Sequence, residues 1–386
     1  MSNNGFVVSE KQTTRNSTFE LLRIISMILI VAYHAGRSID VSQLSIFNRG
    51  MFYLISSWGI LGVDLFVIIS AWFLCEQKFR TTKLISLIFE VITYVFAFTI
   101  LSVIWNTYKA GGGEAFVAVL RHHASEFLSP FWANEYWFIT AYIFMLLIAP
   151  FINKLHEFFD QKSLKTLLVL FSFIPVYSTI NGGGVIKDVM NFCYIYFLIS
   201  YLKRTDFCLK SKALKILPYI LMGVLIVGRA VFFTILHNIS STDNALISNI
   251  YLFLDRFINN TILDTGRHSL ILLIIALLIF FSVKDIKPFY SKYINWISGC
   301  TLGVYLFHEN SLFNLCDIFK GYVIKVGFIQ YDAFFPLTYF AVILCIYILG
   351  SMFEFLRIQI LQKPFNSFLN DKKNSLVRFD EFINLK

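Results

Sequence analysis

Apolar residues occur in this chain as long blocks, and short stretches rich in lysine and arginine separate them. An α-helix needs about 20 mostly apolar residues to cross the hydrocarbon core of a bilayer. Blocks near this length predict helices over residues 19–36, 52–75, 84–107, 136–153, 165–180, 186–202, 214–236, 268–283, 296–315 and 333–356. We therefore expect an all-α, polytopic membrane protein with about ten transmembrane helices.

The basic residues are unevenly divided between alternate connections. With the N-terminus inside, the inner segments hold more than twice as many lysine and arginine residues as the outer segments. Such an excess marks the cytoplasmic side of a membrane protein. This pattern predicts that both termini are cytoplasmic. The chain then divides into a cytoplasmic N-terminal segment (1–18), a transmembrane domain (19–356) and a cytoplasmic C-terminal tail (357–386).

Two outer loops are expected to be long, at residues 109–135 and 237–267. Within the second loop, apolar residues recur at helical spacing, which predicts an amphipathic helix on the outer surface or re-entering it. The first apolar block could be mistaken for a secretory signal. Arg23 interrupts it and no clear cleavage site follows, so we interpret it as a retained helix.

Composition agrees with a membrane protein. Hydrophobic residues make up 57% of the chain and charged residues 15%, against about 25% charged in soluble domains. The net charge of +9 would suggest nucleic-acid binding in a soluble protein. Here the basic residues flank apolar blocks, so membrane orientation explains them and no nucleic-acid partner is expected. The six cysteines show no C-x-x-C spacing, which favours free thiols, and we expect no metal site.

The first predicted helix carries ionisable residues through its depth. Arg23 and His34 are eleven residues apart, which is three helical turns plus about 20°, so they share one face. They are separated by roughly 16 Å along the axis. Ser26, Tyr33 and Arg37 lie on the same face. A polar stripe of this kind lines a cavity or packs on polar partners. The alternatives are a snorkelling Arg23 and a His34 that only bonds a neighbouring helix.

Other ionisable residues fall inside predicted spans and sort by depth. Glu90 and Glu354 lie in the inner half, at the level of Arg23. Asp64 lies near the middle, and the outer half holds His308, Glu309 and Arg229. Each could be part of a structural ion pair. Two clusters at two depths, joined by the first helix, favour a site that is reached from both sides of the membrane.

Four segments carry a family resemblance, in the expected order along the chain. They are Phe19-Glu20-Leu21-Leu22-Arg23 through Tyr33-His34; Gly62-Val63-Asp64-Leu65-Phe66-Val67-Ile68-Ile69-Ser70-Ala71-Trp72-Phe73-Leu74; Tyr136-Trp137-Phe138-Ile139-Thr140-Ala141 leading to Ala149-Pro150; and Leu302-Gly303-Val304-Tyr305-Leu306-Phe307-His308. Together they resemble the acyltransferase 3 family of integral-membrane acyltransferases, of the bacterial surface-glycan type. The chain departs from the family pattern at two places. Ala71 follows Ser70 where the family usually has a glycine, and no Arg-Pro pair follows the basic residues Lys78, Arg80 and Lys83.

The resemblance implies acyl transfer, from a cytoplasmic acyl-coenzyme A, with acetyl-coenzyme A the expected donor, to a hydroxyl of a surface polysaccharide or lipid-linked glycan. It also implies a multi-pass protein of the bacterial cytoplasmic membrane, with no bound cofactor. A histidine has the proton affinity that general-base catalysis needs near neutral pH. His34 is therefore the expected base, and Arg23 the expected ligand of a donor phosphate.

The remaining site residues have less defined roles. Either Asp64 or Glu309 could orient the imidazole of His34, and the sequence does not choose between them. Tyr33, Trp137, Tyr305 and His308 are expected to line the substrate cavity. The acceptor is expected to arrive from the outer half, under the loop at 237–267.

Two other functions remain open from the sequence. Transporters, flippases and polymerases of envelope glycans also have many helices and buried charges, but internal repeats or paired broken helices would favour a transporter, and we find no repeat. A scaffold without catalytic activity is the third possibility. The polar stripe of the first helix argues against it, because polar residues in a span make insertion less favourable.

Overall fold

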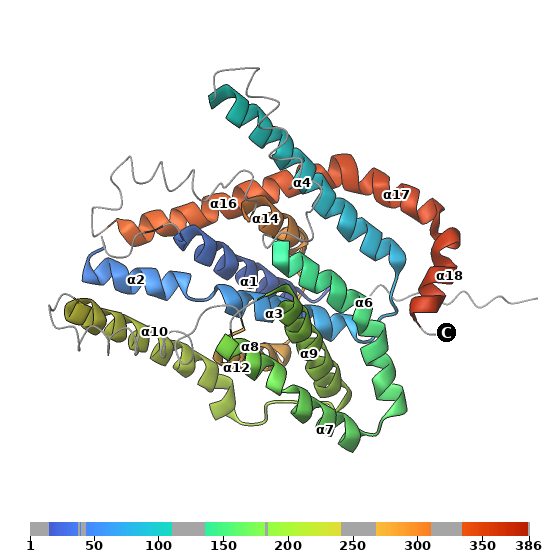
Figure 1. The fold of residues 1–386 in the computed structure, drawn as a ribbon, viewed down its shortest axis with the longest axis horizontal. Coiled ribbons are helices and arrows are strands. Elements are labelled where there is room, and N and C mark those ends of the chain that lie inside the picture. The colour runs from blue at the N-terminus through green and yellow to red at the C-terminus, as the bar shows by residue number, and fades with distance from the viewer. Residues whose placement is uncertain are drawn as a thin grey trace, which may run out of the picture.

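The chain folds into helices throughout the part that the computed structural model describes, which is residues 15–37, 39, 44–109, 136–181, 184–240, 268–309 and 334–384. The elements are α1 (Ser17–Gly36), α2 (Ile46–Ser56), α3 (Gly59–Leu74), α4 (Thr81–Lys109), α6 (Trp137–Phe158), α7 (Gln161–Phe171), α8 (Phe173–Asn181), α9 (Val185–Arg204), α10 (Lys212–Ser240), α12 (Leu270–Lys284), α13 (Lys292–Gly299), α14 (Thr301–His308), α16 (Phe335–Arg357), η4 (Ile358–Gln362), α17 (Lys363–Asp371) and α18 (Lys373–Ile383). Figure 1 shows their arrangement.

Seven helical segments within the described residues are long and apolar enough to cross a membrane. They are Ser17–Gly36, Ile46–Leu74, Thr81–Trp105, Trp137–Phe158, Gln161–Ile180, Val185–Arg204 and Phe335–Asp371. The shorter helix Leu270–Lys284 is also apolar. These segments confirm an all-helical membrane protein. The count of ten spans and the cytoplasmic position of both termini stay predictions.

The helix expected at 52–75 is two helices. Ser45 caps the start of α2 by accepting a hydrogen bond from the backbone N–H of Asn48, and α2 ends at Ser56. After Trp58 the chain continues as α3 from Gly59. A Cβ at Gly59 would lie 2.6 Å from the Cβ of Tyr33, so the new helix starts where its backbone meets α1.

The helix expected at 296–315 is also divided, and it ends early. Cys300 separates α13 from α14, and α14 ends at His308 with Glu309 as its C-cap residue. A continuous span through residue 309 is therefore wrong. The early end places two ionisable residues together at a helix terminus.

The C-terminal tail expected at 357–386 is helical through Ile383. A π-helical turn, η4, joins α16 to α17. The helical structure therefore continues without a break past residue 356, where the span is expected to end. The tail then folds back on α4, where Asp380 accepts a hydrogen bond of 2.6 Å from the backbone N–H of Thr81. This bond caps the first turn of α4 from the opposite end of the chain.

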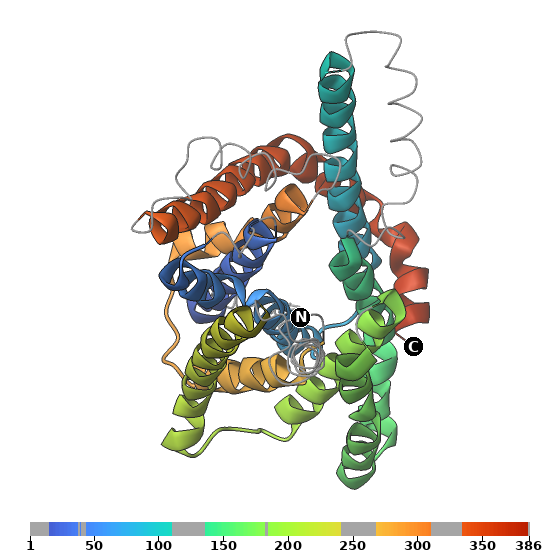
Figure 2. The ribbon, with the colours of Figure 1, turned by 60° about the vertical axis from the view of Figure 1, so that its left-hand side comes forward.

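Helix α1 lies inside the assembly, against α2, α3, α13, α14 and α16 (Figures 1 and 2). Its closest approach is to α3, because Gly62 has no side chain where a Cβ would meet the carbonyl oxygen of Ser26 at 2.4 Å. Small residues let membrane helices approach in this way. On another side, the hydroxyl of Tyr339 donates a 2.5 Å hydrogen bond to the carbonyl of Ala32. These contacts fix the helix that carries His34.

Some sequence-based expectations lie outside the described residues. They are the loop at 110–135, the amphipathic helix expected within 241–267, and the end of the span expected at 296–315 beyond residue 309. Helix α10 extends through Ser240, beyond the expected end of its span at 236. The side chain of Arg229 is outside the description as well.

Candidate active site

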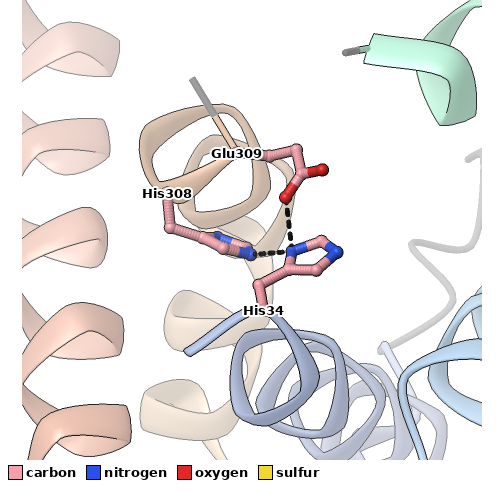
Figure 3. Close-up of side chains that lie close together, drawn as sticks. All are labelled: His34, His308 and Glu309. Carbon is pink, nitrogen blue, oxygen red and sulfur yellow. Dashed lines mark hydrogen bonds and ion pairs between the residues drawn. The ribbon is translucent and has the colours of Figure 1, made fainter. Parts of the chain in front are cut away.

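The ends of α1 and α14 bring three ionisable side chains together. His34 lies three residues before the C-cap of α1, His308 is the last residue of α14, and Glu309 follows it. The Nδ1 atom of His34 is 2.6 Å from Oε2 of Glu309 and 2.9 Å from Nε2 of His308 (Figure 3). Only 9% of the His34 side chain and 9% of the Glu309 side chain are exposed. The cluster is therefore largely shielded from solvent.

The hydrogen bonds assign the tautomers of both imidazoles. Nδ1 of His308 is 2.6 Å from the carbonyl oxygen of Val304, which can only accept, so Nδ1 carries the proton. In a neutral His308, Nε2 is then an acceptor. Both partners of His34 Nδ1 are therefore acceptors, and this nitrogen carries the proton. The lone pair of neutral His34 is left on Nε2.

Nε2 of His34 lies on the side of the ring away from His308 and Glu309 (Figure 3). A neutral imidazole with a carboxylate on one nitrogen and a lone pair on the other is the arrangement of a general base. The carboxylate holds the ring in one orientation and stabilises the imidazolium that forms when the base takes a proton. The site thus has the chemistry to remove a proton from a hydroxyl group.

Arg37 completes the polar contacts of Glu309. Its Nη1 atom is 3.1 Å from Oε1 of Glu309, and its guanidinium lies over the ring of Tyr33, 5.4 Å from the ring centre. The two carboxylate oxygens therefore have different partners, one cationic and one on His34. Arg37 lies one turn after His34 on the polar face of α1. The sequence places Arg37 on that face without indicating a role for it at the site.

Aromatic rings pack beside the histidines. The ring of Tyr305 is perpendicular to that of His308, at 6.0 Å between centres, and 5.3 Å from the ring of Phe138. Tyr136 donates a 3.2 Å hydrogen bond to the carbonyl of Leu306. Of the four expected cavity residues, Tyr33, Tyr305 and His308 thus lie at or beside the His34 cluster.

Asp64 and Trp137 lie at a different place. They line a cavity of about 20 Å³ together with Asn191 and His268, which is space for about one water molecule. On one side of it, Nε2 of His268 is 2.7 Å from Oδ1 of the fully buried Asp188. Of the two carboxylates considered as partners of His34, the structure places Glu309 against the imidazole, while Asp64 lines the separate cavity.

Arg23 lies near the other end of α1 and is paired within its own helix. Its Nη1 atom is 2.6 Å from Oε1 of Glu20, whose second oxygen accepts a 2.5 Å hydrogen bond from Ser298. The guanidinium also lies 5.6 Å from the ring centre of Phe73. With 17% of its side chain exposed, Arg23 is neither fully buried nor free in solvent. Glu20 belongs to the family-like segment, but the sequence does not reveal that it pairs with Arg23.

Glu90 and Glu354 form a second buried cluster, with Arg357. The guanidinium of Arg357 contacts both oxygens of Glu354, at 2.7 and 2.8 Å, and lies 3.6 Å from Glu90. Tyr94 donates a 2.9 Å hydrogen bond to Glu354. This is the structural ion pair considered as an alternative for both glutamates. Arg357 was counted as a basic residue of the tail, because sequence alone does not reveal that α16 continues and turns it inward.

The family of the chain follows from comparison with known proteins. No characterised protein and no solved structure gives a significant match. A family model described as an acyltransferase domain matches residues 16–353, so the match includes α1, α14 and the His34 cluster that they form. Because that match covers most of the chain, the protein belongs to the acyltransferase 3 family of membrane acyltransferases.

Proposed function

We propose that this membrane acyltransferase moves an acetyl group from acetyl-coenzyme A to a carbohydrate hydroxyl, with His34 as the general base. The acceptor would be a surface polysaccharide or a lipid-linked glycan at the bacterial cytoplasmic membrane. One observation carries the proposal: Glu309 lies 2.6 Å from Nδ1 of His34, while the lone pair on Nε2 faces away from both protein partners. A base with a fixed tautomer and an open second nitrogen suits proton removal from an attacking hydroxyl.

The reaction follows in two steps. The acceptor oxygen attacks the thioester carbonyl carbon while Nε2 of His34 takes the hydroxyl proton, which gives a tetrahedral intermediate. Glu309 then faces an imidazolium, whose charge the carboxylate stabilises. When the intermediate collapses, the carbon–sulfur bond breaks and His34 returns the proton to the thiolate. The products are a sugar ester and free coenzyme A, and His34 is again neutral.

The donor would bind through its phosphates near the inner end of α1. The guanidinium of Arg23 has donors beyond the one that Glu20 uses, so it can contact a phosphate as well. A groove of about 230 Å³ offers a second place for phosphates: Arg80 just before α4, Lys83 and Ser86 of α4, and Asn366 of α17 are among its lining residues. His34 lies about 16 Å from Arg23 along α1, so an extended donor would reach from one to the other.

The acceptor would approach the outer end of α1. Tyr33 lies beside His34 there, and an aromatic ring of this kind can stack on a sugar while its hydroxyl forms hydrogen bonds. Tyr305 is buried and packs against His308. A role for Asp64 and Trp137 in acceptor binding has less support, because the cavity they line is too small for a sugar. We propose that they support the packing of α3 and α6 against α9.

A reconstituted assay tests the function. The purified chain in lipid nanodiscs is given acetyl-coenzyme A and an envelope glycan acceptor. We expect release of the coenzyme A thiol and an equal amount of glycan carrying one added acetyl group by mass spectrometry. Thiol release without glycan modification in a panel of acceptors would restrict the proposal to thioester hydrolysis. A glycan that crosses vesicle membranes with no thioester consumed would support a transporter or flippase instead.

A further inference from the structure

The three side chains of the active-site cluster offer the donor atoms of a metal site. Nδ1 of His34, Nε2 of His308 and a carboxylate oxygen of Glu309 all lie within 4.8 Å of one another. Two imidazoles and one carboxylate form a ligand set typical of zinc, with a fourth position left open. We propose that this cluster binds a divalent transition-metal ion, Zn²⁺ in particular, and that the bound ion inhibits the enzyme.

Two of the three ligands already have the outer partners that metal ligands need. A metal-binding histidine usually donates its other ring N–H to a backbone carbonyl or carboxylate, which fixes its tautomer. His308 does so, through Nδ1 to the carbonyl of Val304 at 2.6 Å, and its Nε2 lone pair is directed at His34. Glu309 has one oxygen held by Arg37 at 3.1 Å, which leaves the other for a metal.

The present spacing requires only a small adjustment. His34 Nδ1 is 2.6 Å from Glu309 and 2.9 Å from His308, which are hydrogen-bond distances. A tetrahedral zinc with bonds of about 2.0–2.1 Å holds its donors about 3.3 Å apart. The two pairs that include His34 must therefore separate by less than about 1 Å, and the third pair, which lies within 4.8 Å, must reach the same spacing. Rotation of the side chains at two helix ends can supply both changes.

The bound ion and the catalytic base exclude each other. Zinc can bind Nδ1 of His34 only after this nitrogen loses its proton, and the neutral ring then carries its proton on Nε2. Nε2 is no longer a base, and Glu309 no longer accepts from His34. The inhibitory half of the inference rests on the proposed role of His34, whereas the binding half does not.

The charge of the cluster favours a reversible site over a resident ion. Glu309 is the single carboxylate among the three ligands, and the nearby guanidinium of Arg37 offsets its charge. A structural zinc site is closed by four protein ligands, often thiolates, whereas this cluster supplies three ligands. We expect zinc to bind from solution and to leave when a chelator is added.

Metal content and turnover test the two halves separately. The full chain, purified without a histidine tag, is dialysed against ZnCl₂ in the absence of substrates, and bound metal is counted by atomic absorption. Co²⁺ is used in parallel, since tetrahedral coordination gives it a characteristic visible spectrum. We expect one ion per chain. His308→Asn and Glu309→Gln should each lower the zinc affinity more than about 100-fold, which is a larger loss than replacement of a residue that only contacts a metal ligand would cause.

His156→Asn is the matched control, because it removes an imidazole that is bonded to Ser200 on α9 and lies outside the cluster. Metal binding should be unchanged in this variant.

In the wild type, zinc should lower initial turnover at least tenfold, and chelator should restore it. Equal zinc binding in the wild type and both ligand variants would overturn the site. Binding at the cluster with unchanged or increased turnover would overturn inhibition, and a chain inactive even with chelator would contradict the proposed function while leaving the site intact.

Discussion

Oε2 of Glu309 lies 2.6 Å from Nδ1 of His34, although the two residues are far apart in the sequence. The contact exists because α14 ends at His308 and places Glu309 at the C-cap, beside the last turn of α1. It gives the imidazole one orientation and one tautomer.

Replacing Glu309 tests the carboxylate. Glu309→Gln keeps the shape of the side chain but removes the negative charge that would stabilise the imidazolium, so turnover should fall about 100-fold or more. The Michaelis constant for acetyl-coenzyme A should stay the same. Glu157→Gln is the control, since Glu157 is 59% exposed and pairs with Lys154. Wild-type turnover in Glu309→Gln would show that the carboxylate only supports the structure.

Replacing Arg23 tests donor binding. Arg23→Lys keeps the charge but loses the planar fork, so a lost charge-assisted hydrogen bond should weaken donor binding by about 1.5–3 kcal/mol. The measurement is the Michaelis constant for the donor. If Arg23 only reaches the inner headgroups and binds no phosphate, lysine should replace it without a change in the Michaelis constant. If the constant rises in Lys83→Gln and stays unchanged in Arg23→Lys, the phosphates bind in the groove at α4.

Replacing Gly62 tests the contact between α1 and α3. In Gly62→Ala the added Cβ would lie 2.4 Å from the carbonyl oxygen of Ser26, a backbone atom that cannot rotate away. Overpacking of this kind should destabilise the protein by about 1–3 kcal/mol. Gly223→Ala is the control, because nothing lies within 4 Å of a Cβ at that position. Thermal unfolding in detergent measures both, and equal melting temperatures would contradict the close approach.

Cysteine labelling on intact cells tests the orientation. The excess of basic residues predicts a cytoplasmic C-terminal region and an outer loop at 237–267. In a background with the exposed Cys208 replaced by serine, an impermeant reagent should modify a cysteine placed in that loop. It should not modify Lys372→Cys, whose position is exposed on the C-terminal helices. The reverse pattern would overturn the orientation.

The all-helical fold and part of the candidate site could be predicted from the sequence, because both depend on local rules. Apolar length predicts the spans. The shared face of Arg23 and His34 follows from helical geometry, and His308 and Glu309 were recognised as ionisable residues at the level of His34. The places where helices end are harder, because they depend on tertiary contacts. The break at Cys300 has a glycine, Gly299, beside it, but the end of α14 at His308 has neither a glycine nor a proline to indicate it.

The partners of the polar residues could not be chosen from sequence. Asp64 and Glu309 were equal candidates beside His34, since depth alone does not say which face of α3 meets which helix. In the structure, Asp64 lines the cavity with His268. Arg357 illustrates the same limit, because its contacts with Glu354 and Glu90 require that α16 continue through the turn at η4.

The last prediction concerns His34 as the base. His34→Gln keeps a polar side chain near Glu309 and His308, but an amide cannot take a proton from a hydroxyl and pass it to a thiolate. Turnover should therefore fall about 100-fold or more. The variant should reach the membrane at the wild-type level, because a hydrogen bond between membrane helices contributes only about 0.6 kcal/mol on average. Membrane level and melting temperature in detergent are measured first.

O-acylation of the cell glycan then separates the two roles of His34. A structural histidine needs only a hydrogen-bonding side chain, which glutamine provides, so acylation would continue at the wild-type rate. A general base needs a lone pair that accepts a proton reversibly, which glutamine lacks. Ser26→Ala removes a buried hydroxyl from the same polar face, bonded only to its own helix at 2.7 Å, and should acylate normally. A folded His34→Gln variant with wild-type acylation would therefore reject the mechanism, since among the described residues only His34 has one ring nitrogen paired with Glu309 and the other left to accept a proton.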